Sequence, residues 1–269
     1  MPEQLQEGQF YGNSNFKACF NGITITDTEY TYPYVDWHCH ENPHFTFLLQ
    51  GKLIEENKKE AYQLTRGDVV FHNWQDFHRN IKPPEFSRGA HVEIKQTWAK
   101  ALDIDLNQIE GSIQIQNPRL KNLVFKVLLE SRQADLHTHT SIELLLLEIL
   151  TGIHQDQKRL ADKRPSWLDK LEILIYENRD NLLRTRDICA ELGIHPVHLS
   201  RTFHKHYGIT FGQYGREIRL NKAVNSILAR RHRLTDIAYL AQYYDQSHMN
   251  AAFRKHFKTT PKKVIKLIG

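Results

Sequence analysis

The chain has 269 residues, of which 40% are hydrophobic and 25% charged, and its formal net charge is +5. This ordinary globular composition argues against a collagen-like, solenoid or disordered chain, and the length suits two domains. Residues 1–166 carry 18 Lys/Arg and 22 Asp/Glu, a net of −4, whereas residues 167–269 carry 18 and 9, a net of +9. The C-terminal part therefore suits a polyanion such as nucleic acid, although a basic surface can also serve solubility alone.

The chain lacks the signals of export and of membrane insertion. Its first residues, MPEQLQEGQF, contain no basic segment followed by an apolar one, and two glutamates interrupt the most apolar window, 142–150. Cys19, Cys39 and Cys189 lie far apart, without the spacing of a disulfide framework. We therefore expect no membrane partner and a reducing, cytoplasmic location.

Short β-type segments fill the region from residue 20 to about residue 97. Runs such as ITITDTEYTY, FTFLLQG and GDVVFH are rich in β-branched and aromatic residues and are separated by Gly, Pro, Asn and Asp. Such runs are typical of strands bounded by turns. We predict an antiparallel β domain, a closed or sandwiched barrel.

Four histidines in this region are spaced like the paired motifs of the cupin barrel. His38, His40 and His44 precede a glycine at position 51, and His78 follows the pair Gly-Asp at 67–68. The segment resembles the cupin pattern, in which an HxH pair, a glutamate and a later histidine bind a metal. His44 stands where the glutamate would be. The resemblance implies a divalent metal at His38, His40, His44 and His78, and His38 and His40, as alternate residues of one strand, can both point inward.

Two interpretations of these histidines remain open. A His-rich set suits Zn, Fe, Ni or Cu, and the spacing does not choose among them. In the alternative, which we favour, the histidines line the pocket of a small organic effector or of no ligand, and no cofactor is required. Aromatic residues supply an apolar wall in either case. The predicted pocket consists of His38, His40, His44, Phe47, Phe71, Trp74 and His78, with Trp37, Phe45 and Phe77 as further wall residues.

Two amphipathic helices are predicted after the β region, because residues 120–128 and 142–153 each place their apolar side chains on one helical face. Leu144 and Leu147 widen the second face, which favours a homodimer, although an ordinary core helix explains it equally well. The charged stretch QDQKRLADKRP then ends in a helix-breaking proline. We predict a sensing and dimerisation domain at 1–155, a linker at 156–166 and a second domain at 167–269.

The second domain contains an internal repeat. LSRTFHKHYGIT at 199–210 reappears as MNAAFRKHFKTT at 249–260. Upstream of the two copies, Thr185 and Thr235 are placed as helix N-caps, each with an aspartate in the first turn. In the first copy Gly193 can end one helix and Pro196 can start the next. We predict two helix-turn-helix units, at about 185–207 and 235–257, joined by a helix at 213–228.

The repeat carries a family resemblance. LNKAVNSIL, DIAYLAQYYDQSHMNAAFRKHF and TTPKKV closely resemble the C-terminal domain of the AraC/XylS transcription regulators over about residues 167–267. The resemblance implies a seven-helix domain that binds double-stranded DNA, with two recognition helices, at about 195–206 and 245–257, in successive major grooves. It also implies RNA polymerase as a partner. The expected fold class is thus a two-domain α+β chain with a cupin-like N-terminal domain and an all-α C-terminal domain.

The position of a residue on a predicted recognition helix indicates whether it contacts bases or phosphates. Residues in the first turns face base edges, Arg201 suiting guanine and Asn250 adenine, and later cations reach phosphates. Any of the histidines can instead be a neutral, solvent-exposed side chain. The predicted DNA-binding residues are Val197, His198, Ser200, Arg201, His204 and Lys205 in the first unit, and Gln246, Ser247, His248, Asn250, Arg254 and Lys255 in the second.

The second unit departs from the family pattern. Gln242 and Lys258 stand where glycines are usual, and Met249 replaces a phenylalanine. A non-glycine residue at a positive φ has a conformational cost. Ala251 stands where the first repeat has Arg201, so we expect the first unit to dominate sequence specificity.

Three functions compete at this point. The first is a DNA-binding regulator, activator or repressor, controlled by a small-molecule effector in the barrel through residues 117–153. The second is a metal-dependent cupin enzyme, such as an oxygenase or isomerase, with an accessory nucleic-acid module. The third is an architectural protein that binds any duplex. The tandem repeat favours the first, because an enzyme has no need of it; we therefore assign no catalytic residue.

Overall fold

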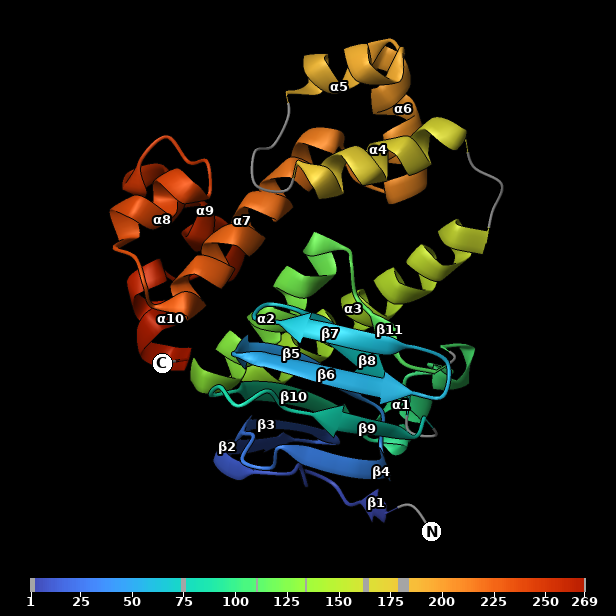
Figure 1. Ribbon diagram of the computed structural model, residues 1–269, viewed down its shortest axis with the longest axis vertical. Helices are drawn as coiled ribbons and strands as arrows, with labels where there is room; N and C mark the ends of the chain where they lie inside the picture. The colour runs from blue at the N-terminus through green and yellow to red at the C-terminus, as the bar shows by residue number, and fades with distance from the viewer. Residues whose placement is uncertain are drawn as a thin grey trace.

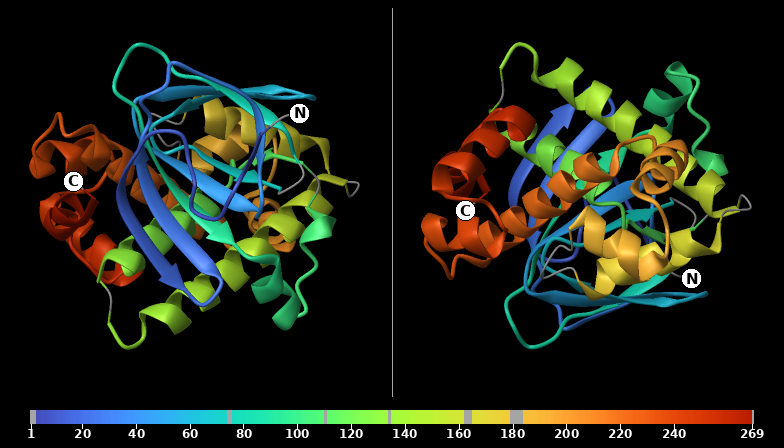
Figure 2. Two further views of the ribbon diagram at one scale, coloured as in Figure 1. Left: turned by 90° about the horizontal axis from the view of Figure 1, so that it is seen from below. Right: turned by 90° about the horizontal axis from the view of Figure 1, so that it is seen from above.

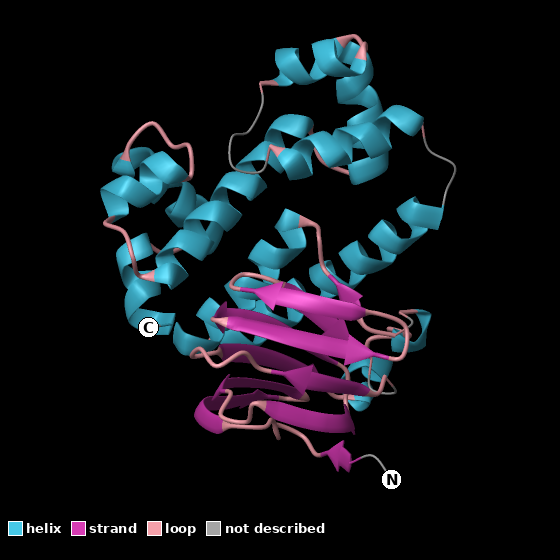
Figure 3. Ribbon diagram, viewed as in Figure 1, coloured by secondary structure: helices cyan, strands magenta, loops and turns pink. Residues whose placement is uncertain are grey.

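The computed structural model describes residues 3–73, 76–109, 111–133, 135–161, 165–178 and 184–268. Strands gather in the N-terminal half of the molecule and helices cover one side of them (Figure 1, Figure 3). The strands are β1 (Glu3–Leu5), β2 (Asn13–Phe20), β3 (Ile23–Glu29), β4 (Tyr34–His40), β5 (His44–Gln50), β6 (Lys52–Asn57), β7 (Ala61–Thr65), β8 (Val69–His72), β9 (His78–Ile81), β10 (Arg88–Ile94) and β11 (Ile113–Gln114). The helices are α1 (Gln96–Ala101), a 3-10 turn (Leu106–Gln108), α2 (Pro118–Gln133), α3 (Thr138–Ala161), α4 (Ser166–Glu177), α5 (Thr185–Leu192), α6 (Pro196–Tyr207), α7 (Phe211–Ala229), α8 (Leu234–Leu240), α9 (Gln246–Phe257) and α10 (Pro261–Ile268).

The strands form two sheets and not a closed barrel. One sheet has the order β1-β4-β9-β6-β7 and the other β11-β8-β5-β10-β3-β2. The pairings are antiparallel except that of β1 with β4, which is parallel. The α+β fold class is confirmed, with the barrel corrected to a two-sheet sandwich.

The outer face of the six-stranded sheet is apolar, and its inner face carries polar residues beside a small apolar cluster that includes Leu48 and Val70. On β5, Phe45 and Phe47 belong to the core shared with the helices, whereas His44 and Thr46 line the space between the sheets. This follows from the two-residue period of a strand, which sends neighbouring side chains to opposite faces. Strands β5 and β10 therefore contribute both to the hydrophobic core and to the pocket.

Helices α2 and α3 cover the outer face, and the expectation of two amphipathic helices is confirmed. Phe125 of α2 is fully buried, with its ring centroid 5.5 Å from that of Phe47. Helix α3 is longer than predicted and stays helical to Ala161, so the first half of the stretch assigned to a linker is helix. Its basic residues Lys158 and Arg159 lie in the last turn, where they complement the negative end of the helix dipole.

The C-terminal helices are divided between two cores. Helices α4, α5 and α6 enclose a small cluster around Leu168, Ile188 and Phe203. Helices α8, α9 and α10 pack instead into the large core that contains Phe125 and the outer face of the sheet. Helix α7 joins the two, because Tyr214 packs on the small cluster while Ala223 and Ile227 belong to the large one. The bridging role predicted for this helix is confirmed.

Helix α7 is docked on α2 by a buried polar cluster as well as by apolar contacts. Asn122 of α2 is fully buried, and its amide nitrogen donates to the backbone oxygen of Glu217 at 3.0 Å and to its carboxylate at 2.7 Å. Asn221 in turn donates to the Asn122 side-chain oxygen at 2.5 Å and to the Pro118 backbone oxygen at 3.2 Å. Figure 2 shows α7 crossing over the N-terminal half, with the second helix-turn-helix unit at its far end.

We predict that Asn122→Ala lowers the free energy of unfolding by about 1–3 kcal/mol, because buried groups of Glu217 and Asn221 lose their partner. Urea denaturation followed by far-ultraviolet circular dichroism measures this change. The matched control is Gln133→Ala, which removes an exposed hydrogen bond from Lys263 of α10 at the C-terminal end of the same helix α2. We expect the control to cost less than about 0.5 kcal/mol; equal effects of the two variants would contradict the importance of the buried cluster.

Candidate nucleic-acid interface and histidine pocket

The first helix-turn-helix unit consists of α5, a three-residue turn and α6. Gly193 ends α5 in the left-handed conformation, at φ 63°, and Pro196 occupies the first turn of α6. Both features were predicted. His195 caps α6, since its Nδ1 accepts a hydrogen bond from the Val197 backbone nitrogen at 3.3 Å. The turn therefore directs α6 away from the body of the chain.

The second unit consists of α8, a longer turn and α9. Asp245 caps α9 by accepting from the His248 backbone nitrogen at 2.7 Å. Gln242 and Lys258 adopt positive φ values of 61° and 55°, as their alignment with family glycines implies. A side chain at such a φ strains the backbone.

The predicted threonine caps are wrong in both units. Helix α5 begins at Thr185 itself and α8 begins at Leu234, one residue before Thr235, so the cap positions fall on Arg184 and Arg233. Neither arginine makes a side-chain capping bond. The aspartates of the first turns, Asp187 and Asp236, are where the sequence placed them and favour the positive ends of the helices.

The two recognition helices present equivalent faces. Leu199 and Met249, at matching positions of the repeat, are both fully buried and hold α6 and α9 to their units. Arg201 and Ala251 also match and are both exposed. Among the predicted contact residues, only Gln246 and Asn250 are half-buried, and the exposed ones are Val197, His198, Ser200, Arg201, His204, Lys205, Ser247, His248, Arg254 and Lys255.

Helix α7 separates the two recognition helices, which lie toward its opposite ends (Figure 1). Its 19 residues correspond to a length of about 28 Å at 1.5 Å per residue. Successive major grooves on one face of a duplex are about 34 Å apart. The helix is therefore of the right order of length to place α6 and α9 in adjacent grooves.

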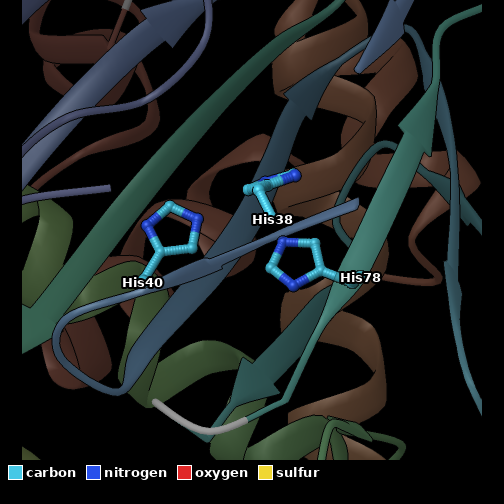
Figure 4. Close-up of side chains that lie close together, drawn as sticks. All are labelled: His38, His40 and His78. Atoms are coloured by element: carbon cyan, nitrogen blue, oxygen red, sulfur yellow. The ribbon is translucent and has the colours of Figure 1, made fainter. Parts of the chain in front are cut away.

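The inner faces of the two sheets enclose a pocket lined by histidines. His38 and His40 come from β4, His44 from β5 and His78 from β9, and all four are buried. Figure 4 shows His38, His40 and His78 gathered between β4 and β9. One donor atom of each of these three lies within 4.8 Å of the others. Their convergence is what the cupin resemblance implies for these three histidines.

His44 lies next to this group and outside it. Its ring centroid is 4.2 Å from that of His40 but 6.4 Å from that of His78. The structure thus brings together three of the four histidines of the implied metal set and places the fourth against the ring of His72, at 4.4 Å.

Burial keeps these imidazoles neutral. Desolvation is the largest cause of the lowered pKa values of His38, His40 and His44, and neighbouring imidazoles lower those of the last two further. Burial also lowers the pKa of His78 to about 3 and raises the pKa of the Glu55 carboxyl to about 8. Neutral imidazoles with free lone pairs are the form in which histidine binds metals.

Part of the predicted pocket wall is wrong. Phe47 and Phe71 lie on the outer face of the sheet, in the core beneath α2, because each is one residue out of phase with the inward-facing His44 and His72. Trp74 lies outside the described residues.

Among the buried polar residues between the sheets, sequence analysis missed Glu55 of β6, His72 of β8 and His91 of β10. Strand alternation was the available signal, since His72 ends the run VVFH in phase with Val70 and out of phase with Phe71. The His91 ring is held by the hydroxyls of Thr26, at 3.1 Å, and Tyr30, at 2.9 Å. Phe10 stacks on it with a centroid distance of 3.5 Å and fills part of the pocket.

Comparison with known proteins supports the interpretation of the C-terminal half. Residues 188–266 match the model of a helix-turn-helix domain family. The transcriptional activator RhaR of Yersinia pestis is 20% identical over 239 residues, covering 84% of this chain and 82% of RhaR. The probable transcription factor PqrA of Proteus vulgaris is 33% identical over 85 residues, covering 32% of this chain and 70% of PqrA. The chain belongs to the AraC/XylS family. It is a DNA-binding transcription regulator.

Two solved structures are also similar to this member of the AraC/XylS family. ToxT from Vibrio cholerae is 13% identical, with a TM-score of 0.40 over 97% of this chain and 100% of ToxT. A cupin-2 domain protein from Shewanella frigidimarina is 14% identical, with a TM-score of 0.29 over 32% of this chain and 84% of that protein. Within the described residues, no helix combines the length and apolarity that a bilayer span requires.

The two repeats provide a reciprocal test of backbone strain. Lys258 ends α9 at φ 55°, and its counterpart Gly208 ends α6 at φ 68° with open space around it. We predict that Lys258→Gly raises the free energy of unfolding by about 1 kcal/mol and that Gly208→Lys lowers it by a similar amount. Thermal denaturation of both variants measures the two changes in the free energy of unfolding. Changes of the same sign would contradict the assignment of strain to the left-handed cap.

Proposed function

We propose that the chain regulates transcription by recognising two short DNA elements through α6 and α9, with its N-terminal domain controlling that binding. The observation that carries this proposal is the pair of exposed, matching recognition helices in the basic half of the chain. A single projecting helix is common in unrelated proteins. Two projecting helices at the ends of one connecting helix suit successive major grooves on one face of a duplex.

Selection of bound sequences from random duplex DNA tests specific recognition. We expect two short elements about one helical turn apart at physiological salt. Arg201→Ala should remove the preference at one element, losing about 1–3 kcal/mol of discrimination, since a bidentate arginine reads guanine. Enrichment of no sequence, despite salt-sensitive binding, would contradict specific recognition.

A matched control separates base contacts from phosphate contacts. Lys205→Ala removes an exposed cation of the same helix, placed for the DNA backbone. We expect it to weaken binding to all sequences alike and to reduce the salt dependence, without changing the selected elements.

Control by the N-terminal domain is supported by the buried junction between α2 and α7. Helix α2 lies directly beneath β5, which carries His44 into the pocket, and holds α7 through Asn122. A ligand that shifts β5 therefore has a continuous packed route to the helix that sets the spacing of α6 and α9. An organic effector must displace Phe10 from the pocket, whereas an ion need not.

The cupin-like arrangement implies a metal, and the residues present fit one. His38, His40 and His78 would hold it, and His40 Nδ1 is buried without a hydrogen-bond partner. Such a metal would supply Lewis acidity. We propose a sensing role for this pocket and not a catalytic one, because the family to which the chain belongs consists of regulators.

We further infer a cytoplasmic bacterial homodimer that contacts RNA polymerase, since the Yersinia relatives are named transcriptional activators. The dimer is proposed to form through α3, where Leu144 is 61% exposed beside an apolar face that is buried in the core. Leu144→Glu should then convert a dimeric mass to a monomeric one in light scattering at micromolar concentration. Leu136→Glu, at a residue 98% exposed just before α3, is the control and should change nothing. A monomeric wild-type mass would overturn the dimer.

A further inference from the structure

A second cluster of metal-ligating side chains lies beside the first: Glu55 and His78 line the pocket, His72 lies next to them, and neither cupin motif contains Glu55 or His72. Glu55 comes from β6 and His72 from β8, and one donor atom of each lies within 4.8 Å of the other and of a donor atom of His78. All three residues are at most 3% exposed. Glu55 and His72 lie on strands that carry none of the four motif histidines.

Two of these buried polar atoms have no hydrogen-bond partner among the residues that the structure describes. His72 Nε2 and Glu55 Oε1 make no hydrogen bond, although Glu55 Oε1 lies 3.3 Å from His72 Nδ1. An unsatisfied buried polar atom costs about 1–3 kcal/mol, so such atoms indicate a missing partner. Two of them in one cluster, both capable of metal ligation, point to a cation.

Hydrogen bonds outside the cluster orient its imidazoles as metal ligands require. His78 Nδ1 lies 3.2 Å from the backbone oxygen of Asp76, which can only accept, so the ring donates there and leaves Nε2 as a free lone pair. Ser112 donates to the Asp76 carboxylate at 2.5 Å, so its oxygen can accept from His72 Nδ1 at 3.3 Å. This arrangement leaves His72 Nε2 as an acceptor as well.

The size of the pocket suits an ion. Its free volume is about 40 Å³. One water molecule needs roughly 10–15 Å³, whereas pockets for organic ligands measure roughly 300–1,000 Å³. A four-coordinate ion bound at 2.0–2.1 Å holds its ligand atoms about 3.4 Å apart, so small rotations of the side chains close the set.

We propose that Glu55, His72 and His78 form a binding site for a divalent transition-metal ion of the zinc type, distinct from the set that contains the HxH pair. Two imidazoles and one carboxylate form a ligand set that suits zinc and leaves a coordination position open. His78 belongs to both sets, so the two sets are alternatives for one ion per chain, and we assign that ion to Glu55, His72 and His78 and not to the set that the cupin resemblance implies. This inference goes beyond the proposed regulatory function and does not depend on it.

Metal titration of the purified full-length protein tests the site. The protein is stripped with a chelator and titrated with zinc chloride in a calorimeter and with cobalt chloride in a spectrophotometer. We expect one ion per chain and visible cobalt bands of low-symmetry coordination. Glu55→Gln, which keeps the shape of the side chain, and His72→Phe should each weaken binding by about 100-fold or more, since even indirect partners of a metal cost 10–100-fold.

Two further variants make the result decisive. His38→Phe removes a ligand of the HxH set alone and should change affinity by less than tenfold. His91→Gln is the control for a buried histidine whose two ring nitrogens already face hydroxyls, and it should bind like the wild type. Circular dichroism and DNA binding establish that each variant is folded.

The proposal is overturned if the wild type binds no zinc or cobalt. It is also overturned if His38→Phe abolishes binding while Glu55→Gln and His72→Phe leave it intact, because the ion then belongs to the HxH set. Since the titration contains no DNA, failure here leaves sequence-specific DNA recognition untouched, and loss of DNA selectivity leaves the metal site untouched.

Discussion

The burial of α7 against α2 is the contact on which the arrangement of the whole molecule depends. It places Leu220, Val224 and Ile227 in the same core as the outer face of the six-stranded sheet. The second helix-turn-helix unit is thereby fixed to the N-terminal domain, while the first unit keeps a separate small core. Contact between α3 and the first unit is polar by comparison: Arg159 donates to Glu172 at 2.8 Å and lies over the Tyr207 ring. The two units of the repeat are alike internally and differ in how they are held.

Sequence reasoning succeeded where the signal was local. The repeat fixed the register of α6 and α9, and Gly193 and Pro196 fixed the turn between α5 and α6. Helical periodicity found α2 and α3. It missed β1 and β2, because EQL and NSNFKACF carry few β-branched residues and owe their conformation to pairing with β4 and β3. Sequence analysis also missed the contact between Asn122 and Glu217. These residues are 95 positions apart, so no local pattern indicates that they meet.

The candidate pocket shows the same contrast between local sequence signals and contacts that depend on the whole fold. The HxH spacing placed His38 and His40 on one face of a strand, and the cupin resemblance added His78, which the structure brings close to both. Strand alternation indicates that His72 faces away from Phe71, but only the order of the strands places β6 and β8 around the same space and brings Glu55 close to His72. The prediction of an aromatic pocket wall was wrong for a simpler reason. Phe47 and Phe71 were judged by residue type, whereas strand phase decides which side of a sheet a side chain occupies.

Helix α7 also sets the distance and the relative rotation of the two helix-turn-helix units. Each residue of an α-helix advances the chain by about 1.5 Å and turns it by about 100°. An insertion of one residue between Tyr214 and Ala223 would barely change the separation of α6 and α9 but would rotate one of them about a quarter of a turn relative to the other. The two would then face different sides of a duplex. The length of α7 can therefore drift among relatives only in steps of about one helical turn, or together with the spacing of their DNA elements.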